Sequence, residues 1–492
     1  MRITNTIRTN TTMRNVNRSK TNLHEAENQM SSEKKITRPS DDPIVAIRAL
    51  SLRSTLSEIT MYLKDNIPEG EAWLKVTEGA LDNMDGLLSD IYQYCTQGSS
   101  DQFTEDDRSA IIQTLQKYKD GLYAELNTDY AGRYAFTGYR TDSTFTFQDQ
   151  DDYAQKKYSI TQTFKSTEID TVNVMKGGVD PTVITNIPAS ATPETRSAYR
   201  LRLAYTNCED TVVGDVTIDG TTYTPQAVTH EQFETMATDG TFDGASNSFY
   251  YIYDTGELIM TDDLYDTVKD AEEISFVYEK EGFRKEDVKP EMYFDCTDIT
   301  DPANPHDYLQ GDDGQLIYYA INFGQTLQVN TLGNQTLTHD VGRDIDDMCN
   351  SIQAVADAEA KVAKLKEMKN SSVYSDAQKE DIESMLTAAQ KELDYATDNM
   401  KKLFQREMGR VKGYQETVDL QMADLGARNK RLTLTKSRLT EQYTTFDDLK
   451  SVNEDAELEE TVVNVSSAKA LYQAALGAAS TVIQQSLLDY IR

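Results

Sequence analysis

The placement of prolines constrains this chain more than any other feature. Three of its ten prolines lie before residue 70, seven lie between Pro181 and Pro305, and residues 306–492 contain none. A proline inside an α-helix removes a hydrogen bond and clashes with the preceding turn. Long helices are therefore expected only at the two ends of the chain.

Charge divides the chain at similar positions. The 492 residues include 82 Asp or Glu and 49 Lys or Arg, a net charge of −33, and residues 141–340 hold 36 acidic and 12 basic residues, a net charge of −24. Such acidity repels phosphate backbones and anionic lipid headgroups, so neither nucleic-acid binding nor membrane binding is expected. No stretch of about 18 apolar residues is present to span a bilayer.

The N-terminal part is predicted to form helices with heptad seams. A weak seam in the first arm consists of Val16, Ser19, Leu23, Ala26 and Met30. The arm is expected to end at Arg38–Pro43, where Asp41 or Asp42 can cap the next helix and Pro43 suits its first turn. A seam follows from Val45 to Leu63, Pro68 and Gly70 are expected to interrupt it, and a second seam runs from Leu74 to Cys95. A third helix is predicted from Thr104 to about Asn127.

Helical periodicity returns near Ile345, with a polar break at Asn370–Ser372. Apolar residues then recur at seven-residue intervals at Leu386, Leu393 and Met400, and again at Val411, Val418, Leu425, Leu432 and Leu439. These seams are expected to pack within one chain. The last predicted helix carries an apolar stripe from Leu458 to Leu487, which must either fold back on the N-terminal arm or bind other chains.

The middle of the chain is predicted to be mainly β. Alternating apolar residues separated by Gly-containing turns indicate strands at Asp215–Ile218, Ser248–Tyr253, Glu273–Tyr278 and Leu316–Phe323. The order of the strands stays open.

No motif for catalysis is present, and we expect neither enzymatic activity nor a cofactor. The four cysteines are far apart and lack a neighbouring His, so no zinc site or disulfide framework is indicated. The carboxylates Asp149, Asp151 and Asp152 and the pair Asp312–Asp313 lack the spacing of a calcium loop. The tyrosines and aspartates of the middle block suit either a solvated β surface or, less simply, a sugar-binding surface.

Four stretches resemble one known family. They are MRITN at residues 1–5, RPSDDP at 38–43, KVTEGALDNM at 75–84 and GRYAFTGYRT at 132–141, and the C-terminal run from NEDAELEE to LLDYIR is also similar. The chain resembles the flagellar hook-filament junction proteins, the hook-associated protein 3 (FlgL) family, which are flagellin-like. The segment GQLIYYAINFGQTLQVNT is similar to the hairpin that precedes the C-terminal helices of flagellins.

The resemblance implies an elongated α+β fold with terminal coiled-coil helices, a helical bundle and an inserted mainly-β domain. Residues 1–42 with 458–492 are expected to form an inner layer, 43–140 with 315–457 the bundle with its hairpin, and 141–314 the acidic outer domain. The expected role is structural: a ring of about a dozen copies joins the hook side to the filament.

The implied partners are further copies of the chain, hook-associated protein 1 on the hook side, flagellin on the filament side and an export chaperone. The implied location is extracellular, in the flagellum, after export by the flagellar type III apparatus. A flagellin, or a surface adhesin or glycan-binding module carried on the β block, are the alternatives. The predicted assembly interface consists of Val16, Leu23, Met30, Val462, Val465, Tyr472, Leu476, Ala479, Ile483 and Leu487.

Overall fold

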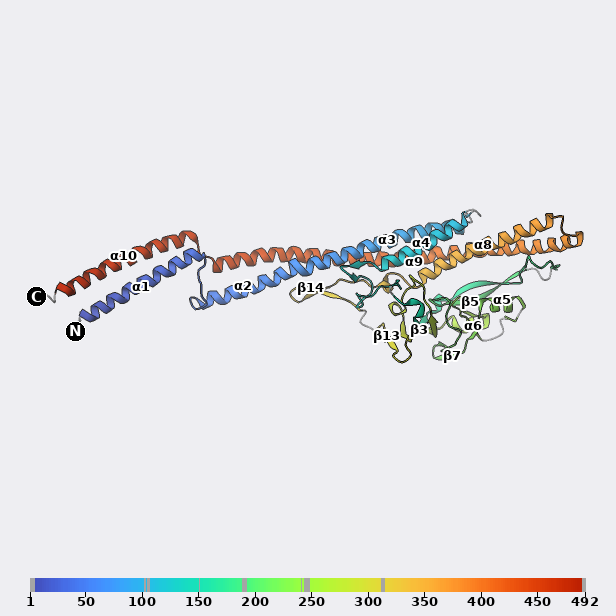
Figure 1. The fold of residues 1–492 in the computed structure, drawn as a ribbon, viewed down its shortest axis with the longest axis horizontal. Coiled ribbons are helices and arrows are strands. Elements are labelled where there is room, and N and C mark those ends of the chain that lie inside the picture. The colour runs from blue at the N-terminus through green and yellow to red at the C-terminus, as the bar shows by residue number, and fades with distance from the viewer. Residues whose placement is uncertain are drawn as a thin grey trace. The chain divides into compact units, whose positions relative to one another are not determined.

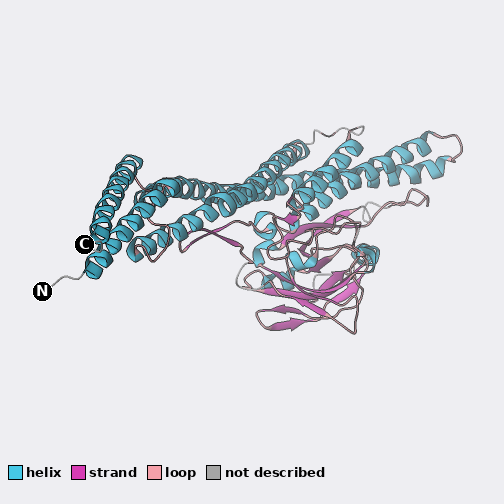
Figure 2. Ribbon diagram, turned by 60° about the vertical axis from the view of Figure 1, so that its left-hand side comes forward, coloured by secondary structure: helices cyan, strands magenta, loops and turns pink. Residues whose placement is uncertain are grey.

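The computed structural model describes residues 5–100, 103, 107–149, 151–187, 193–239, 241–242, 248–310 and 315–488. Long helices form both ends of the chain and strands gather in its middle, so the predicted α+β class is confirmed (Figure 2). The chain divides into two compact units. The first comprises Met1–Gly70, Tyr319–Leu327 and Lys430–Arg492, and the second comprises Glu71–Tyr318 and Gln328–Asn429.

In the first unit the two terminal helices lie side by side. Helix α1 (Asn5–Ser32) packs along α10 (Leu458–Leu488), as Figure 1 shows. The loops that follow α1 and precede α10 are tied by backbone hydrogen bonds, from Lys35 N to Glu454 O at 2.7 Å and from Ala456 N to Glu33 O at 3.0 Å. The C-terminal stripe therefore folds back on the N-terminal arm.

A buried carboxylate stabilises this junction. Glu454 is 3% exposed and accepts two hydrogen bonds from the Arg53 guanidinium, at 2.7 and 2.6 Å. Such bidentate pairing satisfies both carboxylate oxygens. Arg53 lies on α2 (Pro43–Met61), so one ion pair connects α2 to the end of the long helix α9 (Asp376–Glu454).

The predicted start of α2 is confirmed. Asp42 is the cap, and its side chain accepts from the backbone N–H groups of Ile44 and Val45 at 2.9 and 3.2 Å. Pro43 occupies the first turn, where its missing N–H has no acceptor to lose. Asp41 instead accepts from Arg38 N within the preceding turn, at 2.8 Å.

The predicted interruption at Pro68 and Gly70 is wrong. The helix continues from α2 through a π-helical turn at Tyr62–Asn66 into α3 (Ile67–Ser99). Proline lacks an N–H and crowds the carbonyl four residues before it. A wider π turn directly before Pro68 relieves that crowding without ending the helix.

In the second unit, α3 packs with α4 (Arg108–Leu126), α8 (Asp340–Asn370) and the N-terminal part of α9. The predicted break after Asn370 is confirmed, and the helices carry the predicted seams. The second seven-residue stripe of α9 is buried throughout: Val411, Val418, Leu425, Leu432 and Leu439 are each at most 2% exposed. In the first stripe Met400 is buried, whereas Leu386 and Leu393 are half-buried. The helix α4 begins at Arg108, and the predicted start at Thr104 lies outside the described residues.

The middle of the chain forms two sheets. One has the strand order β4-β5-β10-β9-β8 and the other the order β13-β12-β3-β11-β6-β7. Of the neighbouring strand pairs in these two sheets, only β8–β9 is parallel. The first sheet is built from β4 (Asp170–Lys176), β5 (Glu194–Arg202), β8 (Gln226–Val228), β9 (Phe249–Ile252) and β10 (Glu257–Met260). The second is built from β3 (Lys157–Phe164), β6 (Val216–Ile218), β7 (Thr221–Tyr223), β11 (Ile274–Glu281), β12 (Asp295–Asp298) and β13 (His306–Tyr308).

Two-stranded pairs and short helices complete the fold. The pairs are β1 (Asp129–Tyr130) with β2 (Arg133–Tyr134), and β14 (Tyr318–Asn322) with β15 (Gln325–Gln328). The short helices are α5 (His230–Asp239), α6 (Asp262–Val268) and α7 (Gly333–Thr336). The four predicted strand segments coincide with β6, β9, β11 and β14 and are confirmed.

The two larger sheets share one core. Inward side chains from both, among them Tyr251, Leu258, Phe276 and Tyr278, are at most 1% exposed and form one apolar cluster. On the other face of the five-stranded sheet, α5 packs Phe233 against Tyr250. The acidic block is thus a β sandwich with its own apolar core.

A buried ion network joins this sandwich to the helices of the second unit. Arg200 and Arg202 on β5 both pair with Asp347 of α8, at 2.8 and 3.0 Å. Arg410 of α9 pairs with Asp344 of α8 at 2.9 Å and with Asp170 of β4 at 2.6 Å. Burial alone would raise the pKa of Asp347, yet the two arginines hold it well below its ordinary value.

Candidate assembly surface

The seam between α1 and α10 is narrow and made largely of small side chains. On α1 the least exposed residues recur at intervals of three and four, namely Thr9, Thr12, Val16, Ser19, Leu23 and Ala26. On α10 the same spacing picks out Thr461, Val465, Ala468, Tyr472, Ala475 and Ala479. Small residues let two helices approach closely, but they bury little apolar area. This pair therefore covers only one side of each helix.

Apolar side chains remain uncovered on both helices. The exposed ones are Ile7, Met13 and Met30 on α1 and Leu458, Val462, Val463, Leu471 and Leu476 on α10, and Leu471 is 66% exposed. Between Thr461 and Leu488 the only charged residue is Lys469. A helix that is apolar on all sides is normally buried on all sides. None of the described helices is long and apolar enough to span a membrane.

The residues of the predicted interface fall into three groups. Val16 and Ala479 are buried in the seam, and Leu23, Val465 and Tyr472 are half-buried there. Met30, Val462 and Leu476 are 39%, 48% and 43% exposed. The side chains of Ile483 and Leu487 lie outside the described residues. The role of all these residues in assembly stays a prediction, since neighbouring chains would have to supply the contacts.

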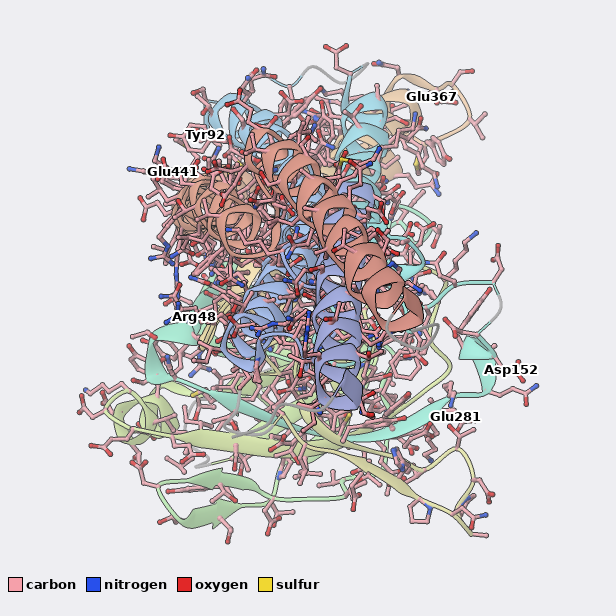
Figure 3. All side chains as sticks on the ribbon, turned by 90° about the vertical axis from the view of Figure 1, so that its left-hand side faces the viewer. Arg48, Tyr92, Asp152, Glu281, Glu367 and Glu441 are labelled. Atoms are coloured by element: carbon pink, nitrogen blue, oxygen red, sulfur yellow. The ribbon has the colours of Figure 1, made fainter. Side chains whose placement is uncertain are left out.

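Sequence reasoning missed a second exposed apolar face, which lies on α2. Ile44, Ile47 and Leu50 are 65%, 68% and 62% exposed, whereas Ala46, Ala49 and Leu56 on the other side are buried. Arg48 projects from this helix in Figure 3. The predicted seam accounted for the inward stripe alone. Apolar residues outside that stripe, three apart, were the signal that could have revealed this face.

The residues considered for metal or covalent chemistry have other partners. Within the described ranges, no group of three or more His, Cys, Asp or Glu is placed to hold a metal ion. Asp149 pairs with Lys285 at 2.9 Å and Asp151 with Lys289 at 3.3 Å, and Asp312–Asp313 lies outside those ranges. Asp152 and Glu281 project from the surface of the β block (Figure 3).

The four cysteines are free and buried. Burial raises the pKa of Cys95, Cys208 and Cys349 to about 12 each, so these thiols stay protonated near neutral pH. A protonated, buried thiol is a poor nucleophile. The cysteines therefore act as small apolar side chains.

Comparison with known proteins identifies flagellar relatives. A family described as the bacterial flagellin N-terminal helical region matches residues 3–141. Flagellar hook-associated protein 3 of Salmonella typhimurium (strain LT2) is 29% identical over 170 residues, which are 34% of this chain and 51% of that protein. The protein of the same name from Escherichia coli (strain K12) is 28% identical over 153 residues, 30% of this chain and 47% of that protein.

The chain therefore spans about half the length of the curated relatives it matches. Among solved structures, flagellar hook associated protein-3 from Legionella pneumophila is 11% identical, covers 82% of this chain and 98% of its own, and has a TM-score of 0.31. FlgL from Xanthomonas campestris is 11% identical, covers 80% and 99%, and has a TM-score of 0.26. Both TM-scores are low, and these structures carry no argument here. The sequence matches confirm the resemblance to hook-associated protein 3.

Proposed function

We propose that this chain is a structural protein of the bacterial flagellum that joins the hook-side junction ring to the flagellin filament. The observation that carries the proposal is the incompletely covered pair α1 and α10. In a single chain, Leu471 and Val463 face solvent at 66% and 62% exposure. Burying a side chain of this size stabilises an assembly by about 1.5–3 kcal/mol, so repeated helix contacts around a ring supply a strong joint.

The proposed partners follow from the same surface. Copies of the chain form a ring of about a dozen, the number that its relatives' family implies. Hook-associated protein 1 lies on the hook side and flagellin on the filament side. The chain acts outside the cell after export by the flagellar type III apparatus, and a chaperone covers the apolar α10 beforehand. Joining requires no bond-making step, so no catalytic residue is assigned.

Removing the chain from the bacterium that encodes it tests the role in assembly. Cells without it should carry hooks without filaments and release flagellin monomers into the medium, because the filament has no joint to grow from. The chain supplied in trans should restore filaments. Normal filaments in the deletion strain would contradict the proposal, and normal swimming with lost surface adhesion would favour the adhesin alternative.

Purified protein separates a junction protein from a flagellin. A flagellin polymerises alone, whereas a junction protein needs a hook-side template. We expect the purified chain to stay monomeric in light scattering when seeded with fragments of its own flagellum's filament. Growth of long filaments from this chain alone would identify it as a flagellin.

A further inference from the structure

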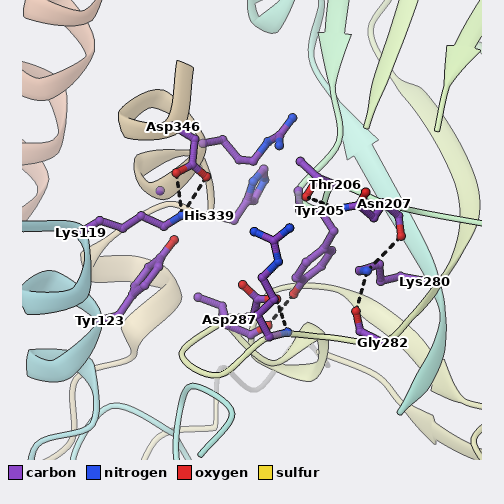
Figure 4. A pocket seen from close by; sticks show the side chains of 15 residues that line it. Lys119, Tyr123, Tyr205, Thr206, Asn207, Lys280, Gly282, Asp287, His339 and Asp346 are labelled. Atoms are coloured by element: carbon purple, nitrogen blue, oxygen red, sulfur yellow. Dashed lines mark hydrogen bonds and ion pairs between the residues drawn. The ribbon is translucent and has the colours of Figure 1, made fainter. Parts of the chain in front are cut away.

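A small polar pocket lies in the second unit, where the β sandwich meets α4 and α8 (Figure 4). It encloses about 110 Å³. Its walls come from Lys119 and Tyr123 of α4, from residues 204–207 after β5, from residues 280–288 at the end of β11, and from residues 339–346 at the start of α8. Four segments distant in sequence therefore converge on one cavity.

The lining has an excess of positive charge. Lys119, Lys280, Arg284 and Arg343 line it, against the two carboxylates Asp287 and Asp346. The whole chain carries a net charge of −33, so a cationic cavity is opposite in sign to the molecule. A cationic pocket on a strongly acidic chain suits an anionic ligand.

Two of the four cationic side chains already have hydrogen-bond partners within the protein. The ammonium of Lys119 pairs with both oxygens of Asp346, at 2.9 and 2.7 Å. The ammonium of Lys280 donates to the carbonyls of Asn207, Glu281 and Gly282 at 3.0, 3.0 and 2.8 Å. These bonds are drawn in Figure 4 where both partners appear. They fix the walls of the pocket.

The two arginines retain donors for a ligand. Arg343 is 8% exposed, and Nη2 donates to Thr255 O at 2.7 Å while Nε, which is buried, has no hydrogen-bond partner. Arg284 is exposed, and no partner of its guanidinium is found in the described part of the chain. A buried N–H without an acceptor is costly, and an incoming oxyanion would satisfy it.

Both carboxylates of the lining already have partners: Asp346 pairs with Lys119, and Asp287 Oδ2 accepts from the backbone N–H of Arg284 at 2.7 Å. The His339 and Tyr123 side chains are neutral. Burial is the main cause that lowers the pKa of His339, so its imidazole is uncharged near neutral pH, and Nδ1 lies 3.5 Å from Asp340 Oδ1. Burial also raises the pKa of Tyr123, which keeps its hydroxyl protonated. An arginine fork beside neutral donors suits a planar carboxylate.

A larger groove of about 1130 Å³ adjoins the pocket. Lys119, Thr206, Asn207, Arg284, Arg343 and Asp346 line both spaces. Elsewhere the groove is lined by amide and hydroxyl side chains such as Asn173, Ser197, Asn350 and Asn399, and by charged side chains of both signs, namely Arg200, Lys402, Arg406, Asp254, Glu257 and Asp347. These groups donate to and accept from sugar hydroxyls, so the groove has room and chemistry for a polar ring attached to the anion.

We propose that this pocket and groove form a binding site for an acidic sugar, with the carboxylate held by Arg343 and Arg284 and the sugar ring in the adjoining groove. The site is independent of the assembly surface on α1 and α10.

Calorimetric titration of the full chain at low salt, with D-glucuronate as the probe, tests the proposal. We expect D-glucuronate to bind and D-glucose, which has the same ring without the carboxylate, to give no measurable binding. Inorganic phosphate should bind at least tenfold more weakly than glucuronate. Arg284→Gln should weaken glucuronate binding about tenfold while the far-UV circular dichroism stays unchanged, because the side chain is on the surface.

Lys285→Gln is the matched control, since it removes one positive charge from the neighbouring position of the same loop without touching the pocket. It should bind glucuronate as the wild type does. Arg343→Gln should abolish binding. The assignment would be overturned if the wild type did not bind glucuronate, or if it bound phosphate more tightly than glucuronate. It would also be overturned if Arg284→Gln bound glucuronate as tightly as the wild type, or if Arg284→Gln and Lys285→Gln lost the same affinity.

Discussion

Glu407 of α9 shows how an unpaired charge is avoided in the interior. The residue is fully buried, and burial together with nearby Asp344 raises its pKa to about 8, although Arg406 and Arg410 lie close. Several carboxylates share a smaller number of arginines in this network, so one carboxyl group keeps its proton. A raised pKa in the folded state means that the contribution to stability is present at low pH and is lost as pH rises through about 8.

We therefore expect Glu407→Gln, which cannot lose a proton, to be more resistant to urea than the wild type at pH 8.5. At pH 5.5, closer to the ordinary glutamate pKa of 4.5, the advantage of the variant should be much smaller. Urea unfolding followed by circular dichroism at both values measures this. Glu441→Gln is the same change at an exposed site of the same helix. It should leave the difference between the urea midpoints at the two pH values as it is in the wild type. A variant that is less stable than the wild type at pH 8.5 would show that the folded protein stabilises ionised Glu407, so that its pKa is not raised.

Single residues were predictable where their partners are close in sequence. Asp42 was one of two candidate caps because a carboxylate before a proline and an apolar stripe is a local signal. Arg200 and Arg202 gave no such signal. Alternation along a strand shows which side chains point inward, but Asp344 and Asp347 are more than 140 residues away, and only the folded chain brings them together.

At the scale of elements, the glycines of α9 provide a direct test of helix propensity. Gly409 and Gly413 are exposed, and a Cβ added at either position would meet no atom within 4 Å. Replacing each with Ala should stabilise the helix by about 0.5–1 kcal/mol, seen as a higher thermal midpoint in circular dichroism. At Gly98 an added Cβ would lie 2.5 Å from the Phe404 ring, so Gly98→Ala should lower the midpoint. Equal effects at all three sites would contradict this explanation.

The exposed face of α10 allows assembly to be separated from folding. Val462 and Leu476 are 48% and 43% exposed, so Val462→Asp with Leu476→Asp should leave the monomer's thermal midpoint nearly unchanged. In the assembly each new carboxylate would have to lose its water, which is strongly unfavourable. The double variant should be exported but hold no filament, and flagellin should accumulate in the medium. Gln473→Asp, a change of one polar residue, is the control and should have the smaller effect.

Filaments of normal length on cells that carry the double variant would show that this face of α10 is not the joint. A collapsed thermal midpoint would place the two side chains inside the monomer's own fold instead.

Elements with a strong period were predicted well, and those set by local backbone geometry were not. The seven-residue stripe of α9 follows from the sequence because residues seven apart lie on the same side of a helix, two turns from each other. The continuity of α2 into α3 was missed because proline normally ends a helix, and the π turn at Tyr62–Asn66 leaves no pattern in side-chain type. The strands were recognised by alternation, but their order depends on pairings between distant segments.

For the whole molecule, the acidic sandwich is a separable part in two respects. Its core between the two sheets is its own, and its surface carries most of the chain's negative charge, with a net −24 in residues 141–340. The division of the chain into inner layer, bundle and outer domain stays a prediction. If it is right, mutual repulsion of this block limits lateral association, and the helices that flank it in sequence carry the joint.

We accordingly expect replacement of residues 150–305 by a short Gly/Ser linker to permit filament growth and swimming. The deletion removes Arg200 and Arg202, yet Asp344 keeps its pair with Arg410 at 2.9 Å and Asp347 lies near the exposed groove, where water can solvate it. The deleted protein should be secreted in normal amounts, measured by immunoblot of the medium, and filaments should be counted by electron microscopy. Asp347→Asn in the deleted chain is the companion variant, since it removes the one carboxylate that loses both arginines. Absence of filaments from both deleted chains despite normal secretion would mean that the sandwich is itself part of the joint.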